Sequence, residues 1–253
     1  MKKTILAGAA LVALGSGVNV AYAEEAAAQP EHAVAYNIGA VSEYRYRGIS
    51  QSRFMPAVNG GIDYTHNPSG FYLGTWASTI RWIKDGGATD GNVEIDIYGG
   101  KRGELTKDLA YDVGVLQYWY PGNTYGDVAG YKNANTTELY GQLGMGPAYL
   151  KYSHAVTNLF GFTDSKNSYY LDAGANLPLD EGLVLNLHLG YQKVKNVDNA
   201  DFTDWKIGVT KDFGFVTGTA AIIGANSDKA VYYSPAGNNT GKTTLVLGLT
   251  KAF

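Results

Sequence analysis

Charged residues spaced two apart are the clearest chemical feature of the sequence. Glu94 and Asp96 have this spacing, and so do Arg45 and Arg47. Side chains at positions i and i+2 lie on the same face of a β-strand, so each pair would project to one side of a sheet. Two neighbouring carboxylates suit acid–base chemistry or Ca²⁺ binding. Because basic residues fall in the same row, ion pairing between strands is our preferred interpretation.

Other arrangements typical of catalysis or metal binding are incomplete. The chain has no Cys, which excludes a thiol nucleophile, a thiolate zinc site and a disulfide framework. Ser153 and His154 are adjacent, so on a strand they would point to opposite faces and could not form a nucleophile–base pair. His66, His154 and His188 fall on three separate predicted strands without metal-ligand spacing. We therefore predict no catalytic residue, no metal site and no cofactor.

A Gly- and Asn-rich segment at residues 236–243 resembles a relaxed phosphate-binding loop. It lacks the first glycine of that motif, and a predicted strand rather than a helix follows it, so a phosphate would find no helix N-terminus. The formal charge of −3 also disfavours binding to a phosphate backbone. We interpret the segment as a surface loop and expect no nucleic-acid partner.

The first residues have the three regions of a secretory signal peptide. Lys2 and Lys3 precede an apolar run at residues 5–14, and the small-residue site Ala21-Tyr22-Ala23 follows. We predict a signal peptide at residues 1–23, cleaved after Ala23, and one domain at residues 24–253. The apolar run is much shorter than the roughly 20 residues that a membrane-spanning helix needs.

The rest of the chain alternates with the period of a β-strand. In the clearest segment, Leu183 to Tyr191, apolar residues occupy every second position and polar residues or glycine many of the others. Similar segments predict twelve strands, whose first residues are near 34, 56, 71, 92, 109, 136, 148, 168, 183, 202, 214 and 242. Long and short connections alternate between them. This predicts an all-β, transmembrane, antiparallel up-and-down β-barrel of about twelve strands, with both termini in the periplasm.

The side of each predicted strand that would face outward carries few charges. Those it has are Lys101, Lys211 and Lys251, at periplasmic strand ends where a long side chain can reach lipid headgroups. Aromatic residues near strand ends would form two girdles at the membrane surfaces. They include Tyr44, Tyr46, Tyr64, Phe71, Trp119, Tyr152, Tyr169, Tyr191, Trp205 and Phe215. A soluble exported sheet with cross-strand aromatic pairs is the alternative.

The inward row is polar and would line the lumen of the barrel. Its candidate selectivity residues are Glu43, Arg45, Arg47, Asp63, Glu94, Asp96, Asp112, Glu138, Lys151, Asp172 and Lys206. Acids outnumber bases, which favours a mildly cation-preferring channel with a transverse field. A barrel plugged by ion pairs is the alternative. Inward glycines such as Gly114, Gly174 and Gly190 would leave space, and this favours an open but narrow channel.

Three motifs carry a family resemblance. They are the segments Tyr44–Ser52, Gly74–Ser78 and Asn92–Gly100, and with them the chain resembles the TorF family of proteobacterial outer-membrane porins. The resemblance implies a barrel in the bacterial outer membrane. The terminal Phe253, with Leu247 and Leu249, also resembles the signal read by the barrel-assembly machinery, which we expect as a partner.

Together these features predict an outer-membrane porin that passes small hydrophilic solutes by passive diffusion, with outer-membrane lipid around it and no enzymatic activity. A structural or receptor barrel with a sealed lumen and extracellular binding loops is the alternative. A lipid-hydrolysing barrel would need a His with a Ser or Asp on one outer wall, and the sequence has no such set.

Overall fold

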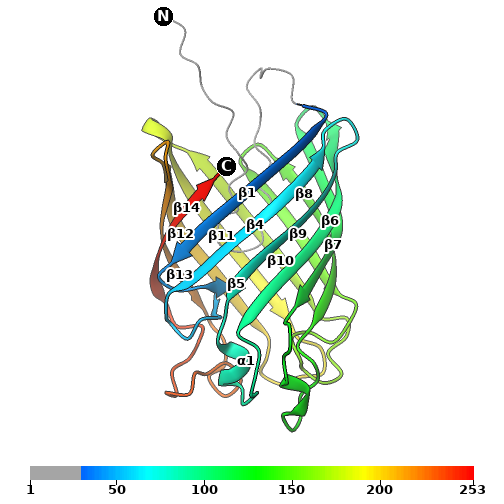
Figure 1. Ribbon diagram of the computed structural model, residues 1–253, viewed down its shortest axis with the longest axis vertical. Helices are drawn as coiled ribbons and strands as arrows, with labels where there is room; N and C mark the ends of the chain where they lie inside the picture. The colour runs from blue at the N-terminus through cyan, green and yellow to red at the C-terminus, as the bar shows by residue number, and fades with distance from the viewer. Residues whose placement is uncertain (1–29) are drawn as a thin grey trace, which may run out of the picture.

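The computed structural model describes residues 30–253, in which twelve antiparallel strands form one closed barrel. Figure 1 shows the strands tilted around a single axis. The barrel strands are β1 (His32–Val41), β4 (Ala57–His66), β5 (Phe71–Thr79), β6 (Val93–Thr106), β7 (Leu109–Trp119), β8 (Thr136–Met145), β9 (Ala148–Ala155), β10 (Tyr169–Pro178), β11 (Leu183–Lys193), β12 (Phe202–Asp212), β13 (Thr217–Ala225) and β14 (Thr244–Ala252). The predicted signal peptide and its cleavage site lie outside the described residues.

Each barrel strand pairs with the barrel strand that follows it in the chain, and pairing of β1 with β14 closes the barrel. In that closing pair, Asn37 lies opposite Ala252 and Val41 opposite Gly248. The predicted all-β barrel is confirmed, and each predicted strand start lies within three residues of the observed one. The prediction succeeded because every wall strand has one face towards the interior and one towards the outside, so alternation persists along its length.

Short turns gather at one end of the barrel and long connections at the other. The upper end in Figure 1 holds the short turns, the start of β1 and the C-terminus. The lower end holds the long connections, with α1 (Trp82–Asp85) and the 3₁₀ helix η1 (Tyr125–Asp127). A second 3₁₀ helix, η2 (Asp180–Gly182), lies in a short turn. Within residues 30–253, no helix is long and apolar enough to cross a membrane.

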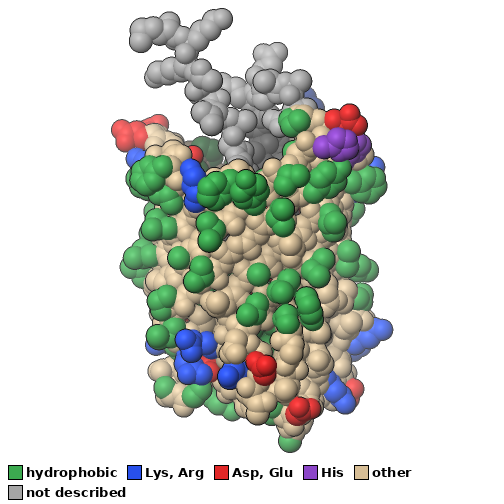
Figure 2. All heavy atoms as spheres, viewed as in Figure 1, with side chains coloured by type: hydrophobic (Ala, Val, Ile, Leu, Met, Phe, Trp, Pro, Cys, Tyr) green, Lys and Arg blue, Asp and Glu red, His purple; other side chains and the backbone are tan. Residues whose placement is uncertain are grey.

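The outer face of the wall is apolar around its middle. Ile207, Leu189 and Leu139 are all more than half exposed near the centres of their strands. Figure 2 shows apolar side chains over this band and most charged groups nearer the two ends. Lys101 and Lys211 lie at the short-turn end, with their ammonium groups 5.2 and 5.9 Å from the ring centres of Phe71 and Phe213.

The connection after β1 differs from the prediction. β1 ends at Val41, and the connection of residues 42–56 follows. Its hairpin of β2 (Arg45–Tyr46) and β3 (Ile49–Ser50) folds into the barrel, while Arg53 and Met55 near its end are exposed. We call residues 42–56 the lumen hairpin. Glu43, Arg45 and Arg47 therefore lie on this hairpin and not on a wall strand, which corrects their predicted position.

The same finding corrects part of the predicted aromatic girdle. Tyr44 and Tyr46 are buried inside the barrel with the lumen hairpin, at 3% and 9% exposure. The alternation of residues 43–47 resembles that of a wall strand because a hairpin also has two faces, one towards each side of the lumen. Other predicted girdle residues, Phe71, Trp119 and Phe215 among them, are exposed on the outside.

Candidate functional site: the hairpin inside the barrel

The tip of the lumen hairpin is a two-residue turn at Arg47 and Gly48. Both residues have positive φ angles, 47° and 74°, which is the requirement of a type I′ turn. Tyr46 and Ile49 pair on either side of the tip. Gly48 has almost no space around it, because a β-carbon there would lie 2.5 Å from the β-carbon of Asp204 on β12. The tip therefore rests directly against another part of the wall.

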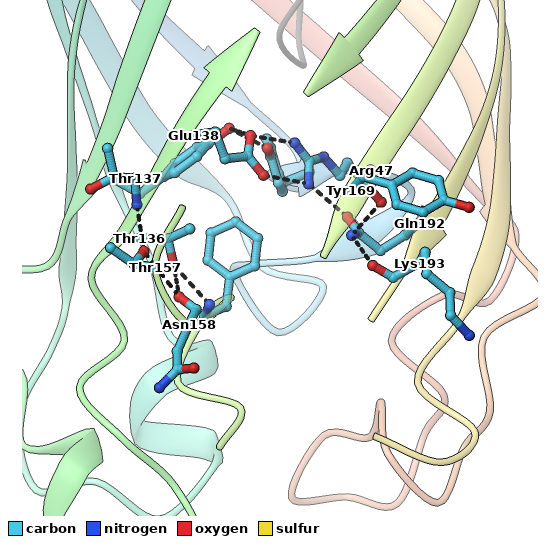
Figure 3. Close-up of polar contacts among 12 residues, drawn as sticks. Arg47, Thr136, Thr137, Glu138, Thr157, Asn158, Tyr169, Gln192 and Lys193 are labelled. Atoms are coloured by element: carbon cyan, nitrogen blue, oxygen red, sulfur yellow. Dashed lines mark hydrogen bonds and ion pairs between the residues drawn. The ribbon is translucent and has the colours of Figure 1, made fainter. Parts of the chain in front are cut away.

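Arg47 connects the hairpin tip to two strands distant from β1. Its Nη1 and Nη2 donate to Glu138 Oε1 and Oε2 at 3.0 and 2.7 Å, and Nη1 also donates to Gln192 Oε1 at 2.6 Å. The guanidinium lies 4.2 Å from the ring centre of Tyr170. Figure 3 shows Arg47 reaching Glu138 on one side and Gln192 on the other. Since Glu138 is on β8, nearly opposite β1 in the strand order, this contact spans the barrel.

Arg45 holds the other side of the hairpin. Its Nε lies 2.8 Å from Glu43 Oε1, Nη1 donates to the Gly48 carbonyl at 2.7 Å, and Nη2 donates to Thr244 Oγ1 at 2.9 Å. Burial lowers the pKa of Arg45, and the adjacent Glu43 carboxylate opposes this effect. Arg45 thus fixes both the conformation of the turn and its position against β14.

Two tyrosines complete the attachment of the hairpin. Tyr44 donates to Glu94 Oε1 at 2.7 Å, and the Tyr46 hydroxyl contacts that of Tyr118. Burial raises the pKa of Tyr44 well above its usual value, and the negative charge of Glu94 raises it further. Tyr44 therefore stays protonated and acts as a donor.

The other candidate residues line the inner wall, mostly in contact with aromatic rings. Asp63 accepts from Tyr98 at 2.6 Å, and Asp112 accepts from Tyr72 at 2.5 Å. The Lys151 ammonium lies 4.3 Å from the ring centre of Tyr140. A second set of contacts joins three polar residues at the wall: His188 contacts Asp172 through Nδ1 at 2.9 Å and Asp204 through Nε2 at 2.7 Å.

Asp96 and Lys206 are the remaining two candidates. Asp96 lies on β6 between Trp76 of β5 and Tyr118 of β7, with one buried carboxylate oxygen. Lys206 lies on β12 opposite His188 of β11. The eleven candidates therefore fall into two groups, three on the lumen hairpin and eight on the wall. The groups meet where Arg47 contacts Glu138, and Glu94 contacts the hairpin through Tyr44. Their role in solute selectivity stays a prediction.

Tyrosines supply much of the hydrogen bonding that sequence analysis missed. Inward glycines make room for their rings: a β-carbon on Gly114 or Gly174 would lie 2.6 Å from the hydroxyl of Tyr140 or Tyr149. Aromatic rings that cover cross-strand glycines in this way stabilise sheets. The expectation that these glycines leave open space was wrong. The signal was present in the sequence, since the inward tyrosines face glycines once strands are paired in register.

Solved structures of outer-membrane channels have a similar fold. KdgM porin matches with a TM-score of 0.55 and 8% identity over 87% of this chain and 98% of that chain. NanC porin matches with a TM-score of 0.53 and 10% identity over 87% and 99%. An outer membrane channel from Pseudomonas putida F1 matches with a TM-score of 0.54 and 13% identity over 92% and 100%. At sequence identities this low, the similarity shows a shared fold and nothing more.

No curated protein matches the chain. A family model does, over residues 25–253, and thus over nearly the whole of the domain predicted from the sequence. The chain belongs to the Gcw_chp family, described as bacterial proteins of unknown function.

Proposed function

We propose that the protein is an outer-membrane channel that passes small hydrophilic solutes by passive diffusion, with the lumen hairpin narrowing its long-loop mouth. The observation that carries this proposal is the reversed polarity of the barrel: Glu94, Glu138 and Asp172 are buried inside, while large apolar residues are exposed outside. A water-soluble barrel would place these two classes the other way round. Hydrocarbon around the wall makes the arrangement favourable.

The interior offers groups that can replace part of a solute's hydration shell. Most of the eleven candidate residues are buried against their partners, whereas Asp63, Asp96 and Lys206 keep part of their surface accessible. These three side chains would contact a passing solute. Acids exceed bases among these candidates, so we expect a mild preference for cations. A structure of KdgM porin is described as a complex with disordered oligogalacturonate.

Placement in the outer membrane follows from the same proposal. The short-turn end would face the periplasm, and the predicted signal peptide would direct export. Phe253 lies at this end, 60% exposed, with its ring 5.4 Å from that of Tyr36. We propose that the barrel-assembly machinery reads this terminus. The resemblance to TorF porins agrees with this assignment.

A receptor or structural barrel with a sealed lumen is the second candidate. It is favoured by the hairpin, whose Tyr44, Tyr46 and Arg47 contact the wall strands β6, β7 and β8, and by the tyrosines that fill the inward glycine positions. Enzymatic function has less support, because Ser153 faces inward and His154 outward.

Single-channel recording in planar bilayers separates the candidates. The channel proposal predicts stable conductance with a modest cation preference and slow passage of small neutral sugars. A folded, inserted protein that never conducts would overturn it. Folding is checked independently by the change in gel mobility between unheated and boiled samples.

A further inference from the structure

Two histidines and a glutamate converge at the short-turn end of the barrel. His32 begins β1 and His66 ends β4, and the two lie directly opposite each other in the strand pairing, with ring centres 5.0 Å apart. Glu31 immediately precedes His32. Its Oε1 lies 3.6 Å from His32 Nε2 and 3.5 Å from His66 Nε2.

The other ring nitrogens are held by hydrogen-bonding partners that point them away from the cluster. His32 Nδ1 lies 2.8 Å from the Tyr64 hydroxyl, and His66 Nδ1 lies 2.6 Å from Ser69 Oγ. In metal sites, such contacts orient the imidazole and set which nitrogen is available to the ion. Here they direct both Nε2 atoms towards the same carboxylate oxygen.

The backbone around Glu31 is also held in place. The Asn67 backbone N–H donates to the Glu31 carbonyl at 3.0 Å, and Asn67 Nδ2 donates to the Pro30 carbonyl at 2.6 Å. These bonds tie the segment before β1 to the turn after β4. The backbone that carries the third ligand is thus held by hydrogen bonds to Asn67.

The other two of the chain's four histidines lack this arrangement. His154 has Nδ1 3.0 Å from the Tyr152 hydroxyl and Nε2 3.2 Å from Asn167 Oδ1. His188 has both nitrogens in contact with carboxylates inside the barrel. In His32 and His66, by contrast, one nitrogen of each ring faces a shared acidic group at the surface.

We propose that Glu31, His32 and His66 bind one divalent transition-metal ion of the zinc class, with water completing the coordination. Metal–ligand distances of about 2.0–2.1 Å in a tetrahedral zinc site place neighbouring ligand atoms about 3.3–3.4 Å apart. The three ligand atoms here already lie within 4.8 Å of one another. Two imidazoles with one carboxylate favour zinc, copper or nickel over Ca²⁺ and Mg²⁺, which prefer oxygen ligands.

Such an ion would join β1 to β4 where the chain enters the barrel. It would bind the folded pair of strands and not the unfolded chain, because His32 and His66 are far apart in sequence and meet only through strand pairing. Zn²⁺ would therefore stabilise the barrel against unfolding. This role does not depend on whether the lumen conducts.

The test is Zn²⁺ titration of the full chain in detergent, purified without a polyhistidine tag and stripped with chelator. Affinity is measured by competition with a chromophoric chelator, and Co²⁺ absorption reports the ligand geometry. We expect one Zn²⁺ per chain and little binding of Ca²⁺ or Mg²⁺. His32→Ala, His66→Ala and Glu31→Gln should each weaken Zn²⁺ binding more than about tenfold, and Ser69→Ala about tenfold through the lost orienting contact.

His154→Ala is the matched control, since it removes a surface histidine outside the cluster. It should bind Zn²⁺ as the unchanged chain does. The proposal is overturned if the folded chain binds no Zn²⁺ at micromolar concentrations, or if the His66→Ala variant binds it equally well. Gel mobility confirms folding of each variant, and its conductance is recorded separately, so failure of the metal site is distinguishable from failure of the channel.

Discussion

Among single residues, Arg47 has the environment most sensitive to change. Its side chain and that of Glu138 are almost fully buried, and two hydrogen bonds join them. Compared with a pair of apolar residues, a buried ion pair adds little net stability to the fold. Removal of one partner is nevertheless costly, because the other charge then stays buried without a counter-charge. Arg47 also holds a left-handed backbone conformation that costs energy for a residue other than glycine. Both features indicate that tertiary contacts hold the tip in place.

Arg47→Ala tests this attachment. Because Glu138 would lose its cation, we expect the free energy of unfolding in urea to fall by about 3–5 kcal/mol, with a higher single-channel conductance and stronger cation preference. Adding Glu138→Gln should restore part of the stability.

The matched control is Lys193→Ala, at the same long-loop end of the barrel. Lys193 pairs with Asp201 and both side chains are partly exposed, so its loss should change the free energy of unfolding far less than the loss of Arg47 does. Equal effects of the two substitutions would contradict a special role for Arg47.

Among the strands of residues 30–253, β2 and β3 of the lumen hairpin are the two that lie outside the closed ladder. β2 and β3 pair only with each other as a sheet, while β1 continues around the barrel to β4 and β14. The hairpin is attached by side-chain contacts and a few main-chain bonds, such as that from Ser50 N–H to the Thr240 carbonyl at 2.9 Å. We therefore expect the barrel to form without it.

Replacement of residues 44–52 by a short Gly/Ser linker should leave a folded barrel with conductance several times that of the unchanged chain, because the main obstruction of the long-loop mouth is gone. Removal of residues 235–238, an exposed part of another long connection, is the control and should have little effect on conductance.

Gly48→Val should also raise the conductance, because both the positive φ angle of Gly48 and its close approach to Asp204 disfavour a side chain. Unchanged conductance after the replacement would show that the hairpin does not limit passage.

For the whole molecule, the decisive feature is which solvent covers the outer face. Ile207 lies at the centre of β12 and is 54% exposed, in a band with Leu189 and Leu139. In water this band would favour aggregation, whereas in a bilayer it faces hydrocarbon. Lys101 and Lys211 lie at the short-turn end of the outer face, where a long side chain can reach the membrane surface.

Ile207→Arg should lower the free energy of unfolding in lipid vesicles by about 2–4 kcal/mol, because the charge would lie at mid-membrane depth. Leu179→Arg, at the short-turn end, should cost about 0–1 kcal/mol. A barrel that folds as a monomer in plain buffer, with both variants equally stable, would contradict the membrane assignment.

The sequence by itself determined the wall of the barrel. Each wall strand meets two different environments along its whole length, so the period of two appears in the residues and marks the first residue of each strand to within three positions. The rows that place Glu94, Asp112 and Asp172 inside follow from the same local rule.

Only the tertiary structure decided what lies inside that wall and at its rim. Residues 43–47 alternate as a wall strand does, and whether they continue β1 or turn into the lumen depends on partners such as Glu138, far away in the sequence. His32 and His66 likewise become neighbours only when the register of β1 and β4 is set. Local periodicity reports the environment of a strand, but contacts between distant segments depend on how the closed barrel brings them together.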